Sequence, residues 1–158
     1  MNKFILPTFA SMLVVQTSYA QEVKTKLGGK DRKIVIDMQN SSVIVESIDG
    51  DELVIKGDGF EEAPKRAEGL RPIYNSAVDN TKIGLSVTQQ DNVVHISRAS
   101  RKEVSYLIRV PRSASVQYKQ AGWNGSSDVV MRDLSGGIEV SMTSGDISLK
   151  NVAGPVVA

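Results

Sequence analysis

The sequence reads DVVMRDLSGGIEV at Asp128–Val140 and DISLKNVAGPVVA eighteen residues later, at Asp146–Ala158. Every aligned apolar position stays apolar: Val129 and Ile147, Met131 and Leu149, Leu134 and Val152, Ile138 and Val156, Val140 and Ala158. The outward positions keep their character as well, since Arg132 becomes Lys150 and Gly136 becomes Gly154. One structural unit copied along the chain is typical of a β-solenoid. The repeat therefore predicts an all-β fold with parallel β-helix coils of about 18 residues, preceded by shorter β-strands.

Stacked coils would bring equivalent positions about 4.8 Å apart. Arg132 would then lie over Lys150, a like-charge contact that Asp133 and nearby acids would have to relieve. An eighteen-residue period also fits three hexapeptide sides of a left-handed helix, but Val and Leu do not recur cleanly at every sixth position. A right-handed coil is therefore favoured.

The chain stops at Ala158, whereas the next repeat would start at position 164. An unfinished coil presents unpaired strand edges. We expect either that the chain is a truncated version of a longer protein, or that another chain covers this edge, which includes self-association through the open C-terminal coil.

Residues 1–20 have the pattern of a secretory signal peptide. Lys3 precedes the apolar run Phe4–Val15, and Ser18-Tyr19-Ala20 is a small-residue cleavage site. The run is too short for a membrane span, so we expect none after cleavage. The chain contains no cysteine, which leaves no disulfide framework and no thiolate metal site. The sequence predicts an exported protein.

Composition limits the remaining classes. Removal of Lys3 with the leader leaves eighteen basic and eighteen acidic residues, so the mature chain is formally neutral and nucleic acid is not an expected partner. Residues 21–158 fit one domain. Aromatic residues make up only 5% of the chain, which predicts an aliphatic core.

Short β-rich stretches precede the repeat and predict further strands. They are Ile34–Ile36, Val43–Val45, Leu53–Ile55, Ile83–Thr88, Asn92–Ser97 and Val104–Val110. Asp49-Gly50 could close a hairpin or serve a solenoid corner, and the sequence leaves both open. Val116 lies eighteen residues before Leu134, which suggests one degenerate earlier coil with residues 120–127 protruding as its loop.

The stretch from about residue 57 to 82 is polar and is broken by Pro64, Gly69 and Pro72. It predicts an excursion loop, and long loops inside a domain are often functional or mobile.

Three segments carry a resemblance to a known family. They are SGGIEVSMTSGDISLKNVAGPVVA at Ser135–Ala158, YLIRVPRSASVQ at Tyr106–Gln117 and VIVESIDGDELVI at Val43–Ile55. The chain resembles the secreted "putative adhesin" proteins of Gram-negative bacteria, a family of unknown biochemical function related to adhesin-head β-solenoid domains. The resemblance implies parallel β-helix coils and export to the periplasm, outer cell surface or medium. It supplies no catalytic residues, and similar proteins continue with further SGDI-like coils.

Catalytic and metal chemistry find little support in the sequence. His95 is the single histidine and lies on a predicted strand, where an outward structural position is the expected role. Asp128, Asp133 and Asp146 lie near glycines, yet the calcium-binding nonapeptide GGxGxD is absent. We expect no catalytic residue, cofactor or metal.

Trp123, between Gly122 and Asn124-Gly125, is a candidate sugar or partner contact, and packing over an open coil end is the alternative. The outward face bearing Arg132, Lys150, Glu139 and Asp133 could bind a glycan, although solvated charge is the commoner reason for such residues.

The sequence thus predicts a non-enzymatic exported protein that presents a β-solenoid for adhesion or binding, with a glycan or a cell-surface protein as partner. One alternative is an enzyme acting on polysaccharide from a coil face, and another is a periplasmic structural or envelope-stress component.

Overall fold

The structure is a computed structural model that describes residues 21–28, 32–60, 66, 77–120 and 128–158. The predicted leader at residues 1–20, most of the predicted excursion between residues 57 and 82, and Trp123 lie outside the described residues. Over the described part, the chain forms strands and no helix long and apolar enough to cross a membrane.

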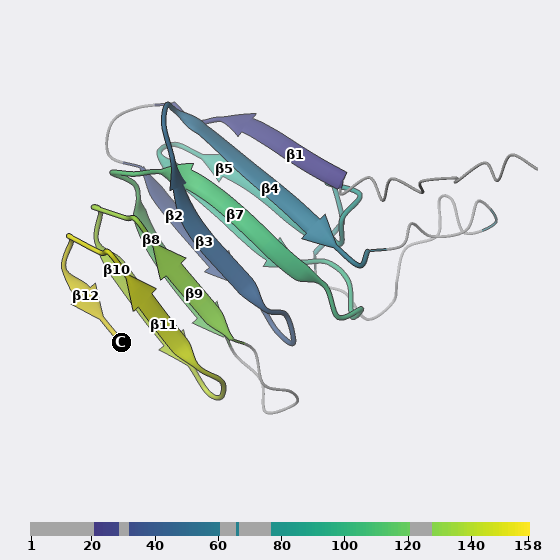
Figure 1. Ribbon diagram of the computed structural model, residues 1–158. Coiled ribbons are helices and arrows are strands. Elements are labelled where there is room, and N and C mark those ends of the chain that lie inside the picture. Colours follow the sequence, from purple (N-terminus) through teal and green to yellow (C-terminus); the bar gives the residue numbers. More distant parts are fainter. Residues whose placement is uncertain (1–20, 29–31, 61–65, 67–76, 121–127) are drawn as a thin grey trace, which may run out of the picture.

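The described strands form two six-stranded mixed sheets, which confirms the all-β class. Sheet A has the order β1 (Gln21–Lys26), β4 (Glu52–Asp58), β7 (Ser105–Pro111), β3 (Val43–Ile48), β9 (Val129–Arg132), β11 (Ile147–Lys150). Sheet B has the order β12 (Val156–Val157), β10 (Ile138–Met142), β8 (Ser115–Gln120), β2 (Lys33–Asp37), β6 (Val93–Arg98), β5 (Leu85–Gln90). The two sheets lie face to face, with the C-terminal strands at one end (Figure 1).

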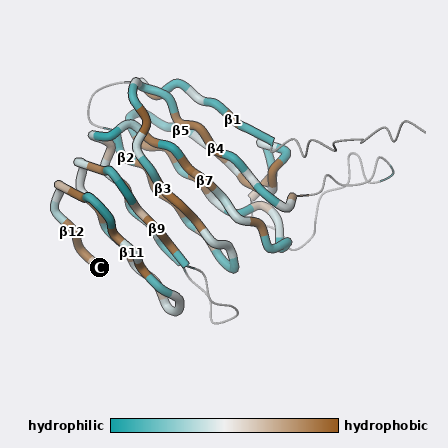
Figure 2. The backbone as a smooth tube through the Cα atoms, in the orientation of Figure 1, coloured by the Kyte–Doolittle hydropathy of each residue, from teal (hydrophilic) through white to brown (hydrophobic). Residues whose placement is uncertain are grey.

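The core between the sheets is largely aliphatic, as the composition predicts. Burial alternates along most of the strands, so that β7 buries Tyr106, Ile108 and Val110 while Leu107 and Arg109 face outward. In β2, Ile34 and Ile36 are fully buried. Apolar segments gather along the middle of the strands and polar ones at many of the turns (Figure 2).

The repeat at the end of the chain sets the strand register. In the parallel pair β9–β11, Val129 lies opposite Ile147 and Arg132 opposite Lys150. In the parallel pair β10–β12, Ile138 lies opposite Val156. The predicted offset of eighteen residues is therefore the register of both pairs, and each repeat contributes one strand to sheet A and one to sheet B.

The register of the preceding rung differs from the prediction. We use "rung" for a strand of sheet B together with the strand of sheet A that follows it in the chain. Val116 lies opposite Ile138 rather than Leu134, an offset of 22 residues. The predicted loop at residues 120–127 falls within this interval, and all of it but Gln120 lies outside the described residues.

In the middle of the molecule, the order of the strands in each sheet differs from their order in the chain. The rung β2–β3 lies between β6–β7 on one side and β8–β9 on the other. Because β7 lies between β3 and β4, Asp49-Gly50 closes no direct hairpin. Antiparallel strands β1, β4 and β5 complete the end away from β11 and β12.

The corners of the repeat use residues suited to left-handed backbone. Asp133 and Asn151, equivalent in the two repeats, have φ of 61° and 50°. The Asn151 side-chain amide donates a hydrogen bond of 2.6 Å to Asp133 Oδ1. Asp133 thus serves the corner, and among the described residues the acid that pairs with Arg132 is Glu46 rather than Asp133.

Candidate binding surface

The outer face of sheet A carries an aligned row of side chains, one from each strand. We call it the charged row: Lys24, Val54, Arg109, Glu46, Arg132 and Lys150, in strand order. The row forms because directly paired residues of neighbouring strands point to the same face of a sheet, in parallel and in antiparallel pairs alike, where no bulge interrupts the pairing. It brings together residues from all six strands of sheet A.

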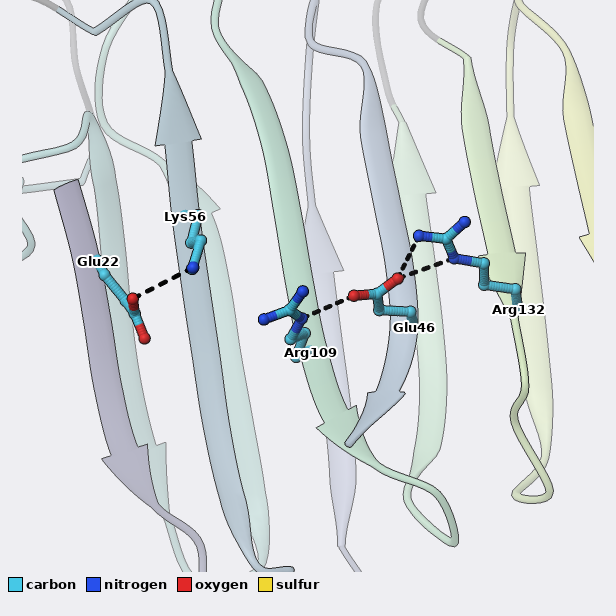
Figure 3. Close-up of polar contacts among 5 residues, drawn as sticks. All are labelled: Glu22, Glu46, Lys56, Arg109 and Arg132. Atoms are coloured by element: carbon cyan, nitrogen blue, oxygen red, sulfur yellow. Dashed lines mark hydrogen bonds and ion pairs between the residues drawn. The ribbon is translucent and has the colours of Figure 1, made fainter. Parts of the chain in front are cut away.

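Glu46 holds the centre of the charged row (Figure 3). Its Oε1 accepts a hydrogen bond of 2.6 Å from Arg109 Nε, and its Oε2 accepts one of 2.8 Å from Arg132 Nε. Arg132 Nη2 also donates to Oε2, so this contact is bidentate at the guanidinium. The Glu46 side chain is only 14% exposed. Both arginines are therefore held in fixed positions by one carboxylate.

The surroundings of Glu46 favour its charged form. Partial burial by itself raises the pKa of Glu46, but the hydrogen bonds from Arg109 and Arg132 and their charges outweigh it and hold the pKa below its usual range. The carboxylate is consequently ionised at neutral pH and is not suited to act as a general acid.

A second network lies at the β1 edge. Glu22 pairs with Lys24 at 3.1 Å. It also pairs with Lys56 at 3.3 Å (Figure 3). The hydrogen bond from Lys24 leads the effects that lower the pKa of Glu22. These are solvent-exposed pairs, so they position charges more than they stabilise the fold.

The β11 end of the charged row has excess positive charge. Arg109, Arg132 and Lys150 are three cations against Glu46, and Lys150 has no ion pair among the residues the structure describes. From β7 to β11 the row crosses three strand spacings, about 14 Å at about 4.8 Å each. The row therefore offers an extended array of cations to an anionic ligand.

An apolar row runs beside the charged row. Leu107, Ile44 and Val130 are in register on β7, β3 and β9, and Ser148 continues the line on β11. Ile44 is 37% exposed, while Leu107 and Val130 are half-buried. An aliphatic strip next to fixed cations suits a ligand with both apolar and acidic surface.

An open depression lies beside the C-terminal end of β4 and the N-terminal end of β7. It has a volume of about 430 Å³ and is lined by Asn40, Ser41, Ser42, Asp58, Glu103, Val104 and Ser105. Its two acids do not suffice for a metal centre. Over the described ranges, no group of three or more His, Asp or Glu side chains is placed to hold a metal ion.

The structure brings two of the predicted site residues together and places the others apart from them or outside the described residues. Arg132 and Lys150 come together as register partners. Glu139 is exposed on β10 in sheet B and faces a different way, because successive strands of the repeat enter different sheets. His95 is exposed on the outer face of β6, where the sequence placed it. Trp123 falls outside the described residues.

Sequence reasoning missed Glu46 and Arg109. Each is a single charged residue on the outward side of an otherwise apolar strand, and this was the available signal. Their pairing was not readable, because Glu46 and Arg132 lie 86 residues apart in the chain.

No protein-family model and no curated protein matches this chain. Among solved structures, it is similar to a "putative cell adhesion protein" from Clostridium sporogenes, with 8% identity and a TM-score of 0.36 over 87% of this chain and 96% of that one. It is also similar to a "putative adhesin" from Bacteroides fragilis, with 13% identity and a TM-score of 0.31 over 89% and 97%. A "putative adhesin" from Parabacteroides distasonis has 12% identity and a TM-score of 0.30 over 85% and 67%. Likeness at this level carries no argument about what the chain does.

The Glu46 network predicts a specific loss of stability in acid. The folded-state pKa of Glu46 is lowered, so its contribution is present above the unfolded pKa and is lost as the pH falls through the folded pKa. We expect Glu46→Gln to lower the free energy of unfolding by about 1 kcal/mol at pH 7 and by almost nothing near pH 3. Urea denaturation at both pH values measures the difference. Glu139→Gln, an exposed acid on sheet B, is the control and should have no effect at either pH. An equal cost of Glu46→Gln at both pH values would contradict the role of the charge.

Proposed function

We propose that this protein is an exported, non-enzymatic binding protein whose charged row holds an acidic glycan or an acidic protein of a cell surface. In this proposal the rungs are turns of a two-faced β-solenoid and the two sheets are its faces, and its right-handed winding stays a prediction. The observation that carries the proposal is the alignment of Arg109, Arg132 and Lys150 on one face, with a single acid between them.

The arrangement of charge supports binding rather than chemistry. Glu46 already holds the side chains of Arg109 and Arg132 in place, so these side chains lose little conformational entropy when a ligand binds. Their remaining N–H groups can donate hydrogen bonds to an anionic ligand. An acid catalyst would need a raised pKa, whereas that of Glu46 is lowered. The resemblance of Ser135–Ala158 and Tyr106–Gln117 to secreted adhesins points the same way.

The proposal predicts salt-sensitive binding that depends on sheet A. On an array of acidic and neutral glycans, we expect signal from acidic ones, falling steeply as ionic strength rises. Reversing the charge with Lys150→Glu should weaken binding about tenfold, because it converts the unpaired cation of the row into an acid. Lys119→Glu on the outer face of sheet B is the matched control and should leave affinity unchanged.

Three results would redirect the proposal. Equal loss in both variants would mean that net charge, not the charged row, drives binding. Release of shorter sugars during the assay would favour the polysaccharide-acting enzyme. No binding to any glycan or surface protein, together with protection of the protein from protease added to intact cells, would favour the periplasmic structural role.

A further inference from the structure

Strand β11 carries core positions that no described strand covers. Ile147 is 40% exposed and Leu149 is half-buried, although their partners on β9, Val129 and Met131, are fully buried. In sheet B the last strand, β12, is also exposed, and both strands lie at the same end of the molecule (Figures 1 and 2). This end therefore has apolar surface of the kind that the rest of the fold buries.

The outer edge of β11, on the side away from β9, has backbone groups free to form hydrogen bonds with another strand. The carbonyls of Asp146 and Lys150 point toward β9, where they accept from the amides of Val129 and Asp133 at 2.9 and 3.1 Å. Successive carbonyls of a strand point opposite ways, so Ile147 and Leu149 direct their N–H and C=O groups away from β9. Within the described residues, β11 is the last strand of sheet A on this side. Such an edge is a template for another strand.

We propose that a second copy of this chain pairs with β11 antiparallel, about a two-fold axis through Ser148. In this register Ile147 exchanges both backbone hydrogen bonds with Leu149 of the second copy, and the reverse pair does the same. Ser148 faces its own equivalent on the outer side. Asp146 then faces Lys150 of the second copy, so the pairing forms two contacts between opposite charges. The contact is isologous and closes as a dimer.

Charge and side-chain direction select this register. A shift of one residue would turn Ile147 and Leu149 to the solvent side of the joined sheet. A shift of two residues would place Lys150 opposite a serine, either Ser148 or Ser144, and remove both charge contacts. Only the register centred on Ser148 combines apolar pairs inside, backbone hydrogen bonds and opposite charges outside.

The other end of sheet A argues against head-to-tail association. Its edge strand β1 presents Glu22, Lys24 and Lys26 on the outer face. Charged residues, Lys above all, are a common means of preventing an edge strand from pairing. The β11 edge is thus apolar, whereas the β1 edge is charged. Pairing of two β11 edges is therefore favoured over pairing of β11 with β1.

A single cysteine tests the position of the two-fold axis. The chain has no cysteine, so Ser148→Cys can form a disulfide only between two copies. Directly opposed residues of a non-hydrogen-bonded antiparallel pair have Cα atoms about 4.5 Å apart, within the range of a disulfide. We expect mild oxidation of the purified protein to give covalent dimer at least about tenfold faster than with Val130→Cys. Val130 is the register partner of Ser148 one strand further in, which adds about 9.6 Å between copies.

Charge reversal tests the register by a different readout. In sedimentation equilibrium we expect wild type to dimerise. Lys150→Glu or Asp146→Lys should each weaken the dimer about tenfold, since each turns both contacts between opposite charges into like-charge contacts. The double variant Asp146→Lys/Lys150→Glu should restore wild-type dimerisation. A wild-type monomer at all concentrations, a double variant no better than the single ones, or equal cross-linking of Ser148→Cys and Val130→Cys would overturn the proposal. Asp146→Lys weakens the dimer without removing a cation of the charged row, so glycan binding that is lost in Lys150→Glu and kept in Asp146→Lys separates the two proposals.

Discussion

Replacement of Gly136 by alanine is expected to destabilise the protein by about 3 kcal/mol. A Cβ atom at Gly136 would lie 2.1 Å from the carbonyl oxygen of Ala114 and 2.5 Å from its carbonyl carbon. Both are backbone atoms of the neighbouring rung, so relief requires the two rungs to separate and lengthens the hydrogen bonds between β8 and β10. Urea denaturation monitored by circular dichroism measures the loss.

The adjacent glycine provides a matched control. A Cβ atom at Gly137 would meet nothing closer than Pro155 Cγ at 3.7 Å, an ordinary contact, so Gly137→Ala should change stability by less than about 0.5 kcal/mol. Gly154 repeats the close contact, with a Cβ 2.0 Å from the carbonyl oxygen of Gly136. The contact at Gly154 positions only the last strand, β12. Gly154→Ala should therefore detach β12 locally and leave the rest of the fold intact, which faster amide exchange at Val156 would show. A stability of Gly136→Ala equal to that of Gly137→Ala would contradict the close stacking of rungs.

Two buried tyrosines are expected to respond to phenylalanine in opposite directions. Tyr106 is 2% exposed, and its hydroxyl donates a hydrogen bond of 2.8 Å to the carbonyl of the fully buried Ile83. Tyr106→Phe should therefore cost about 2 kcal/mol, because it leaves that carbonyl without its donor. Tyr118 is fully buried, and its hydroxyl has no partner among the described residues. Tyr118→Phe should be neutral or stabilise by up to about 1 kcal/mol, because it removes a desolvated polar group.

Thermal unfolding of the two variants in parallel measures this contrast. Each loses one oxygen from the same core, so the pair controls for the general effect of removing a hydroxyl. A similar loss of stability in both would show that the Tyr118 hydroxyl is hydrogen-bonded in solution.

The local features of this fold could be predicted from sequence because they depend on residues close in the chain. The eighteen-residue repeat gave the correct partners for β9 and β11, and alternation at Val104–Val110 predicted the buried side of β7. Arg132 and Lys150 were predicted as stacked neighbours for the same reason. A copied unit carries its register with it, whether or not the rest of the fold is known.

The long-range arrangement could not be predicted in this way. Nothing in the periodicity of Val43–Ile48 indicates that it pairs with β7 and β9, which begin more than sixty residues later. Asp133 and nearby acids were therefore expected to relieve the like-charge contact between Arg132 and Lys150. The structure uses Asp133 for a corner with φ of 61° and brings Glu46 from another strand instead. Strand interleaving, and not local propensity, decides which charges meet.

The position of the rung β2–β3 also determines the order in which the protein can be assembled. Ile34 lies between Val94 and Val116, partners that are 60 and 82 residues further along the chain. A polypeptide that emerges from its amino terminus delivers β2 and β3 before either of their neighbouring rungs, although β1 and β4, at one end of sheet A, also appear early. Strands β2 and β3 must wait, with both sides open, until most of the chain has appeared, so formation of the native state is a late and non-local event. A nascent chain that stops short of β6 has the centre of the protein but neither of the neighbours that hold it.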